Sequence, residues 1–513
     1  MPSSKSALIR APKLPFIVAA TLLFGTANAA PPNAAGQPAW KMDSFDRAET
    51  EGLLARELQE VADKYGLLPG QKRIQITANL GFKERKLVID LGRDAVPSTA
   101  GAGSEQQCQA LVSTSIGILQ DIISVNEFFC TYGGKDIYYY HPEPPTRSAP
   151  TAGAHRQDQA PTIVMVSAGH GYFFNAVSGN WETRRPLMNG MQEDFVTPYF
   201  ARDVSTQIIN KAHLSVAKAR TNVTTIHVPS GHPWWKMSAR TWLENQYPSN
   251  PDIWNSLPNA TGPDAQESND IRARPLFANH VNANYSLHIH TNGFIEDTSR
   301  RGTIGLYQAG RTEDAVYAAR ILCAMKETIQ ANPNYATWNV DVAPRGGNYG
   351  ELRLTDTAKR AALIEVGFHS NPQDAAALQN DTFRSLAVAG MAKGIRLYKE
   401  GKQCATFKID SIPTVSGPVG KPFNYAISYS GNPTYPIKVQ SEPVSCATGW
   451  NCNSFSRTVS SPESSPITQQ INCTTGQPGL SGTFRYKRWL VDADGVKTAP
   501  VEHTYTCNAT TSP

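Results

Sequence analysis

The chain has 513 residues, of which 40% are hydrophobic, so it is long enough for two to four domains and can bury a sizeable core. Charged residues make up only 18%, and the 38 glycines and 36 prolines favour loops and β-structure. No short repeat runs through the chain, which excludes collagen-like and coiled-coil proteins. The formal net charge of +5 is mild. It gives no electrostatic basis for nucleic-acid binding.

The first 29 residues have the pattern of a secretory signal peptide. Basic residues precede the apolar run Leu14–Phe24, and Ala27-Asn28-Ala29 offers small residues at a cleavage site. The apolar run is shorter than the ~20 residues that a membrane span needs, and no later stretch reaches that length. We therefore predict a periplasmic or secreted protein with a cleavable signal peptide over residues 1–29 and no membrane span.

Eight cysteines follow the predicted signal peptide, and none of them belongs to a CxxC pair. An even number of cysteines in an exported chain favours disulfides over a thiolate metal site. Proximity along the chain suggests the pairs Cys108–Cys130, Cys323–Cys404, Cys446–Cys452 and Cys473–Cys507.

The region 30–140 combines strand-like runs with a helical stretch and predicts a small α+β domain of unknown role. The strand-like runs are at residues 74–78, 87–91 and 137–140, and the helical stretch is at residues 105–123. The next segment, 141–162, is rich in proline and alanine and has few large apolar residues. This composition is typical of a linker.

Strand-like runs alternate with helical stretches over residues 163–403. We expect strands at residues 163–166, 225–228, 285–289 and 362–366, and helices at residues 195–212, 313–330 and 375–398. This alternation predicts an α/β catalytic domain with a mostly parallel sheet flanked by helices.

Residues 404–513 have a different character. Phe423, Tyr425, Ile427 and Tyr429 alternate with polar residues, as in a half-buried strand, and Asp494-Gly495 is typical of a hairpin turn. Four of the cysteines lie beyond Cys404 in this region. These features predict a disulfide-stapled, β-sandwich-like domain.

Histidines stand near the ends of two predicted strands of the α/β domain. His170 follows the first strand, where open α/β sheets place their ligands. His288 and His290 are two positions apart, so both face one side of their strand. Imidazoles suit zinc, and a carboxylate would complete a three-ligand site that leaves a position for water. Taken alone, these histidines fit a metal site or ordinary packing roles.

Four motifs occur in order over residues 161–399. They are Ser167-Ala-Gly-His-Gly171, Glu193 opening a helix that contains Ala201, Arg274 to Asn279 followed by His288-Ile-His-Thr-Asn292, and Leu352-Arg-Leu-Thr355 followed by Leu363-Ile-Glu-Val-Gly-Phe-His-Ser-Asn371. Together they resemble the zinc-dependent N-acetylmuramoyl-L-alanine amidases of the amidase 3 type. The resemblance implies a hydrolase that cuts the amide between N-acetylmuramic acid and L-alanine in peptidoglycan.

Carried over residue by residue, the resemblance implies that His170, Glu193 and His290 hold Zn²⁺ and that Glu365 is the catalytic carboxylate. One glutamate beside the metal can activate water and then protonate the leaving amine. Glu365 ends an apolar strand, and a partly dry setting should raise its pKa. His288 and Arg353 are further candidates, for support of the ligands or for contact with substrate.

Several positions depart from the family pattern. Ser167 replaces an aspartate, and Ile226–Pro229 replace the Thr-Arg pair that follows the second strand. Glu193 lies farther from His170 than the pattern requires, so Glu182 stays open as an alternative ligand. We expect His369 to lie at the surface of its motif's turn.

An insertion before Arg274 contains Trp234, Trp235, Trp242 and Trp254. These rings could form a small satellite core under a long loop or could contact substrate.

The expected partners are peptidoglycan and an activator protein, and the sequence does not set the oligomeric state. Two other functions stay open: a secreted zinc peptidase acting on other cell-wall peptide bonds, and a catalytically silent wall-binding protein.

Overall fold

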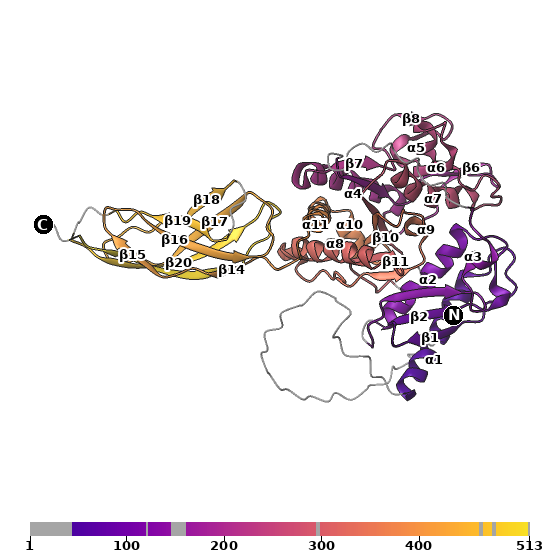
Figure 1. Ribbon diagram of the computed structural model, residues 1–513, viewed down its shortest axis with the longest axis horizontal. Helices are drawn as coiled ribbons and strands as arrows, with labels where there is room; N and C mark the ends of the chain where they lie inside the picture. The colour runs from indigo at the N-terminus through magenta and orange to yellow at the C-terminus, as the bar shows by residue number, and fades with distance from the viewer. Residues whose placement is uncertain are drawn as a thin grey trace, which may run out of the picture. The chain divides into compact units, whose positions relative to one another are not determined.

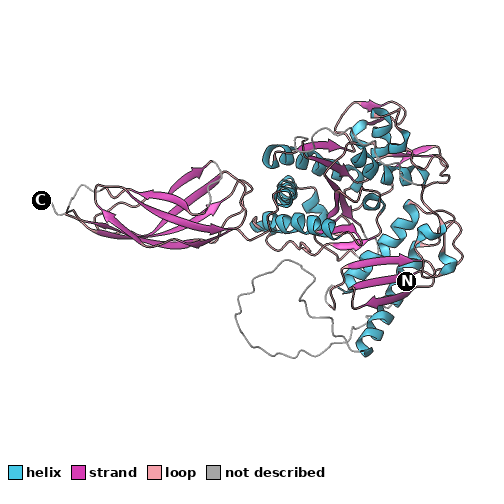
Figure 2. Ribbon diagram, viewed as in Figure 1, coloured by secondary structure: helices cyan, strands magenta, loops and turns pink. Residues whose placement is uncertain are grey.

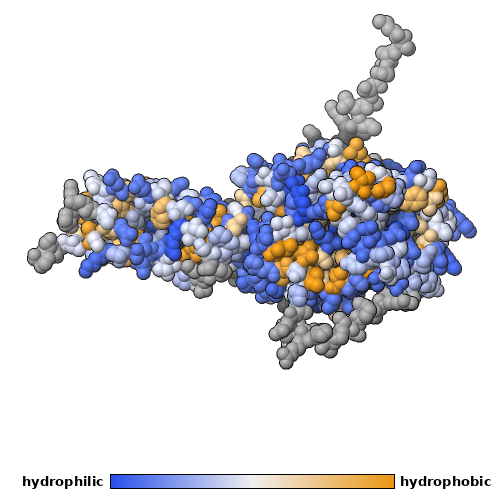
Figure 3. All heavy atoms as spheres, turned by 90° about the horizontal axis from the view of Figure 1, so that it is seen from above, coloured by the Kyte–Doolittle hydropathy of each residue, from blue (hydrophilic) through white to orange (hydrophobic). Residues whose placement is uncertain are grey.

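The computed structural model describes residues 44–119, 122–144, 161–293, 298–460, 465–474 and 479–510. The predicted signal peptide and most of the predicted linker lie outside these ranges. Within them, no helix combines the length and the apolar content that a membrane crossing requires. The face seen in Figure 3 is mainly hydrophilic and carries a few separate apolar patches.

Among the described residues, nine strands form the largest sheet, in the order β1-β2-β3-β12-β11-β13-β10-β4-β7 (Figure 1). Only the pairs β1/β2 and β11/β13 are antiparallel, so the sheet is mixed but mostly parallel. The bounds are β1 (Thr77–Gly81), β2 (Lys86–Asp90), β3 (Glu127–Thr131), β4 (Ile163–Ala168), β7 (Ser215–Lys218), β10 (Tyr285–Asn292), β11 (Ile304–Gln308), β12 (Arg345–Gly347) and β13 (Arg360–Phe368).

Helices flank this sheet, as the alternation of elements predicts (Figure 2). Strand β4 shows how the two faces differ: Val164 and Val166 enter the main core, and Met165 between them enters a second core on the opposite face. The main core is completed by α4 (Glu193–Gln207), α8 (Thr312–Gln330) and α11 (Asp381–Lys399), and the second core by α5 (Ala239–Gln246), α6 (Pro251–Trp254) and α7 (Ala265–His280).

Several expected elements differ in the structure. The strand expected at residues 74–78 begins later, as β1 (Thr77–Gly81). The strand expected at 225–228 is only partly confirmed: it is the two-residue strand β8 (Ile226–His227), which pairs with β9 (His232–Pro233) in a separate hairpin and not in the large sheet. Ile226 is exposed. The neighbour of β4 is instead β7, whose short edge position needs few apolar residues.

The expected strand at 137–140 is wrong. These residues form α3 (Ile137–Tyr140), because the Asp136 side chain accepts a hydrogen bond from the backbone N–H of Tyr138 and caps a helical turn. The expected helix at 375–398 is two helices, α10 (Pro372–Leu378) and α11, because Asn380 caps a new start.

The N-terminal region has its own core but shares the large sheet. Helices α1 (Ser44–Tyr65) and α2 (Ala102–Leu119) pack against β1, β2 and β3 around buried residues such as Leu58 and Ile89. Strand β3 continues the sheet by pairing with β12 through Glu127 and Gly346. The strands of the N-terminal region therefore extend the sheet of the α/β domain beyond β12.

Within the described residues, the C-terminal region contains two further sheets with one common core, in the orders β14-β16-β19 and β15-β21-β20-β17-β18. The bounds are β14 (Lys408–Ser411), β15 (Val415–Pro418), β16 (Phe423–Ser430), β17 (Ile437–Ser445), β18 (Phe455–Val459), β19 (Ile467–Ile471), β20 (Gly482–Val491) and β21 (Val501–Asn508). All eight cysteines are described, and the four predicted disulfide pairs are confirmed.

We predict that acid weakens the C-terminal region through His503. Burial and the nearby Arg488 guanidinium lower the pKa of His503 from 6.5 to about 4. Its Nδ1 accepts a hydrogen bond from Arg488 Nε at 2.9 Å, which requires the neutral ring. The unfolded chain therefore takes up a proton first, so stability is lost as the pH falls from 6.5 towards 4. Relative to the intrinsic exchange rate, which itself falls in acid, hydrogen exchange of β20 and β21 should speed up over that range.

The matched variant is His503→Gln, which keeps a polar side chain but cannot titrate. Its hydrogen exchange should depend less on pH between 6.5 and 4 than that of the wild type. The same acceleration in both proteins would contradict the role given to His503.

Candidate metal centre

Two neighbouring parallel strands bring His170 and His290 together. His290 lies on β10, which pairs with β4, and His170 follows β4 by two residues. The backbone of His170 is left-handed, with φ of 51°, which turns its side chain back towards the sheet edge. Gly169 permits the close approach, because a Cβ there would lie 2.5 Å from His290 Nδ1. The two rings meet edge to face at 5.0 Å between centroids.

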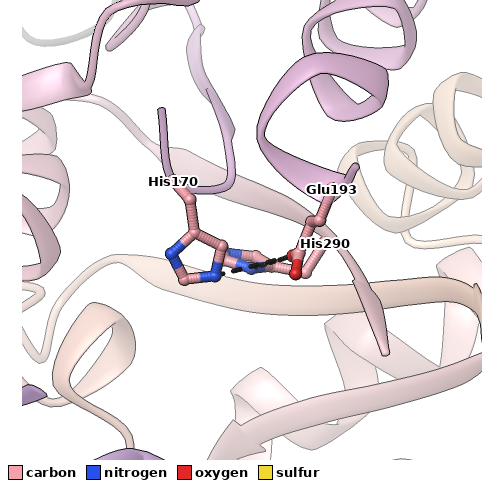
Figure 4. A group of neighbouring side chains, drawn as sticks. All are labelled: His170, Glu193 and His290. Atoms are coloured by element: carbon pink, nitrogen blue, oxygen red, sulfur yellow. Dashed lines mark hydrogen bonds and ion pairs between the residues drawn. The ribbon is translucent and has the colours of Figure 1, made fainter. Parts of the chain in front are cut away.

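Glu193 is the first residue of α4 and its side chain points at both histidines (Figure 4). Its Oε1 lies 2.9 Å from His290 Nδ1 and 3.6 Å from His170 Nε2. All three residues are buried, and one potential ligand atom from each lies within 4.8 Å of the others. The structure thus brings together the three residues named as zinc ligands from the sequence.

The donor set fits zinc, which prefers imidazole and carboxylate ligands. Burial lowers the pKa of His170 well below its usual value, so the ring stays neutral, the form that binds metals. Burial opposes the ionisation of Glu193, but His170, Arg185 and His290 outweigh it and lower the pKa of Glu193 below its usual range.

A protein cation contacts this donor set. Arg185 Nε lies 3.2 Å from His170 Nε2 and 3.1 Å from Glu193 Oε2. The guanidinium therefore stands against the same atoms that would bind a metal ion, which shows that this cluster accommodates positive charge.

Glu351, on α9 (Gly350–Arg353), supports the histidines from behind and was not identified from the sequence. It lies 3.0 Å from His290 Nε2 and 2.9 Å from His288 Nδ1, and it pairs with the buried Arg274. A carboxylate on the far nitrogen of a ligand histidine fixes the ring and its tautomer. Burial lowers the pKa of His290, but the carboxylates of Glu351 and Glu193 outweigh burial and raise this pKa to about 10. The sequence feature that could identify Glu351 is its position directly before the Leu352-Arg353 motif.

Glu365 lies directly beside His290 in the sheet, because the two residues are register partners on β13 and β10. Its Oε1 accepts a hydrogen bond from Gln109 Nε2 of α2 at 3.1 Å. Oε2 is buried and has no hydrogen-bond partner within the described part of the chain. Burial, reinforced by Glu193, raises the pKa of Glu365 to about 7, although His290 opposes the shift. This carboxyl group can therefore both accept and release a proton near neutral pH.

The alternative ligand Glu182 is not part of this cluster. It ends β6 (Asn180–Glu182) and accepts hydrogen bonds from Asn175 and Ser178 in its own hairpin. His369 corrects another expectation: it is buried, not at the surface, and its Nδ1 lies 2.9 Å from Thr291 Oγ1.

A buried arginine holds the loop that carries His170. Arg220 follows β7 and donates to the backbone oxygens of Gly169 at 2.6 Å and Met237 at 2.9 Å. The sequence places the second strand of the sheet at residues 225–228, after Arg220, so Arg220 does not follow the strand in that prediction. In the structure Arg220 stands directly behind the true second strand.

The tryptophan-rich insertion packs mainly as a satellite core. Trp242 and Trp254 pack against the core formed by α5, α6 and α7, and Trp234 contacts Trp242 at 5.5 Å between centroids. Trp235 lies over Phe195 at the start of α4.

Residues 164–397 match the family model described as N-acetylmuramoyl-L-alanine amidase. No curated protein matches the chain. Similar solved structures include the N-acetylmuramoyl-L-alanine amidase from Clostridium difficile 630, at 16% identity, 47% coverage of this chain, 99% of that chain and a TM-score of 0.30. Another is the catalytic domain of the amidase CwlV from Bacillus (Paenibacillus) polymyxa var. colistinus, at 20% identity, 47% coverage of this chain, 99% of that chain and a TM-score of 0.29.

We predict that the chelator-treated protein binds one zinc ion per chain at this cluster. Loss of a ligand should weaken binding at least about a hundredfold, so His170→Ala and Glu193→Gln should both fail to retain zinc in a competition with a fluorescent chelator. Glu182→Gln is the matched control and should bind like the wild type. Zinc retained by Glu193→Gln but lost from Glu182→Gln would reverse the assignment.

Proposed function

We propose that this protein, whose residues 164–397 form a domain of the N-acetylmuramoyl-L-alanine amidase family, is an exported, zinc-dependent hydrolase that acts on peptidoglycan. The domain cleaves the amide between N-acetylmuramic acid and L-alanine. The observation that carries the zinc-dependent mechanism is one juxtaposition: a buried His–Glu–His cluster with Glu365 as the sheet neighbour of His290.

In this proposal His170, Glu193 and His290 hold the zinc ion. Zinc in such a site supplies a Lewis acid, which lowers the pKa of water and polarises the scissile carbonyl. Glu351 accepts the Nε2 proton of His290, so that Nδ1, which faces Glu193, is the nitrogen that would lose its proton and bind the metal ion. His288 shares the Glu351 carboxylate. Arg185 has to leave the donor atoms when a metal ion binds, because its guanidinium contacts two of them.

Glu365 moves the proton. In its ionised form it takes a proton from the water that attacks the lactyl carbonyl carbon. The C–N bond then breaks, and the same carboxyl group delivers the proton to the amine of L-alanine. A pKa near 7 suits both halves of this task, because neither protonation state is strongly favoured. Gln109 holds Oε1 of the carboxyl group and leaves Oε2 for the proton.

The flanking regions define the setting of the enzyme. Four disulfides and the sequence pattern of the first 29 residues support export to the periplasm or secretion. Helix α2 lies over the site through Gln109, and Cys108–Cys130 fastens that helix to β3. A movement of helix α2 would therefore change access to Glu365. This arrangement favours the proposal that an activator protein promotes the activity by acting on the N-terminal region.

We predict that Glu365→Gln removes the hydrolytic activity but not the metal site. Loss of a general acid–base group should lower the rate about 100- to 10,000-fold. The measurement is mass spectrometry of the soluble products released from purified peptidoglycan by the zinc-loaded protein. The wild type should release stem peptides that begin with a free L-alanine amine.

Zinc content is the control, because Glu365→Gln should bind the ion like the wild type. Products cut within the stem peptide would instead support a zinc peptidase. In a third outcome, the zinc-loaded wild type binds peptidoglycan and releases no product, either alone or after addition of a periplasmic extract of the source cells as a supply of activator. That result would support a silent wall-binding protein.

A further inference from the structure

A cavity of about 470 Å³ lies beside the metal centre, between the N-terminal region and α7. A smaller cavity of about 60 Å³ contacts His170, His290 and Glu351. The two cavities share Glu105 and Ile271 in their walls, so they adjoin one another. The smaller one has room for water, since about 10–15 Å³ of such space is enough to hold one molecule. The larger one has room for a short peptide.

Two arginines in the larger cavity share the carboxylate of Glu143, and Arg353 also pairs with Glu105 at 3.3 Å. Arg353 donates to Glu143 from Nε at 2.9 Å and from Nη2 at 3.0 Å, and Arg272 pairs with the same carboxylate. The Arg272 side chain is only 5% exposed and that of Arg353 is 16% exposed. This two-point geometry is the one by which arginine recognises carboxylates.

The position of Arg353 is fixed relative to the metal centre. Arg353 and Glu351 both belong to the single-turn helix α9, and Glu351 contacts His290. The ring of Tyr138 lies 4.0 Å from the Arg353 guanidinium, and the Tyr138 hydroxyl accepts a hydrogen bond from it at 2.6 Å. The arginine is therefore held in place from two sides and does not depend on Glu143 alone.

Glu143 is the removable member of this group. It lies between Pro142 and Pro144 at the edge of the cavity, on a segment that belongs to no helix or strand. The arginines belong to α7 and α9, and the carboxylate that they bind belongs to this segment. A purely structural clamp would tie the segment to the domain and would make no difference to substrate choice.

We propose that Arg272 and Arg353 form a subsite for a carboxylate on the peptide part of the substrate, and that Glu143 fills this subsite until substrate displaces it. This inference rests on the proposed function and specifies its substrate class. The peptide that follows the scissile amide begins with L-alanine, and its second residue carries a carboxylate that is either free or amidated. The subsite favours the free acid, because a carboxamide carries no charge and offers one acceptor oxygen and an NH₂ donor where the two arginines need two acceptor oxygens.

The test uses two substrates that differ at one group: N-acetylmuramoyl-L-alanyl-D-glutamate γ-methylamide and its α-carboxamide analogue. The zinc-loaded wild type should cleave the acid with a kcat/KM about 10- to 100-fold higher, as expected for a hydrogen bond to a charged group. Arg272→Met should reduce this ratio several-fold without abolishing it, because Arg353 keeps its two hydrogen bonds to the carboxylate. Glu143→Gln should lower KM for the acid more than KM for the amide, because the internal competitor for the two arginines is weakened.

A second readout does not depend on turnover. Calorimetry should show that the product L-alanyl-D-glutamate γ-methylamide binds more tightly than its α-carboxamide, and that Glu143→Gln increases this difference. Thermal melting identifies a variant that fails to fold. Equal affinities for the two dipeptides overturn the subsite, even if both substrates are cleaved. Failure to cleave either substrate, with a preserved difference in affinity, overturns the proposed function and leaves the subsite in place.

Discussion

The buried carboxylate of Glu193 is the constraint on which the site depends. A fully buried carboxylate is costly unless it is paired with charges and hydrogen-bond donors. His290, Arg185 and the backbone N–H of Thr291 meet this need, and they come from β10 and from the loop before α4. The fold therefore has to place positive charge and hydrogen-bond donors around the Glu193 carboxylate at the carboxyl ends of these strands. A divalent cation bound to the same atoms would replace Arg185 as the compensating charge.

The sheet explains why the ligands and the acid–base group meet. Strands β4, β10 and β13 are parallel neighbours, so their carboxyl ends reach one edge. His170, His290 and Glu365 stand at these ends, and α4 begins with Glu193 beside them. Because these residues sit at strand and helix ends, their relation to the elements could be predicted from the sequence. The roles of Glu193 and Glu365 came from the resemblance of the four motifs to the amidase family.

Other parts of the site have no local sequence signal. Gln109 reaches Glu365 across 256 positions, and Glu143 reaches Arg353 across 210. Such contacts depend on how the N-terminal region joins the sheet through β3 and β12, which no pattern in the sequence indicates. The position of the second strand differs from the prediction because β7 is a short edge strand. Residues 225–228 contain stronger β-forming side chains, but Ile226 and Val228 are exposed and β8 pairs only within a hairpin.

The most direct test of this account is a crystal structure of the zinc-loaded protein with anomalous data at the zinc edge. We expect one anomalous peak at about 2.0–2.2 Å from ligand atoms of His170, Glu193 and His290, which are normal zinc distances. The Arg185 guanidinium should have moved away from Glu193. The account would be contradicted by a peak at Glu182, or by zinc-treated crystals in which Arg185 still contacts His170 and Glu193 and no peak lies between them.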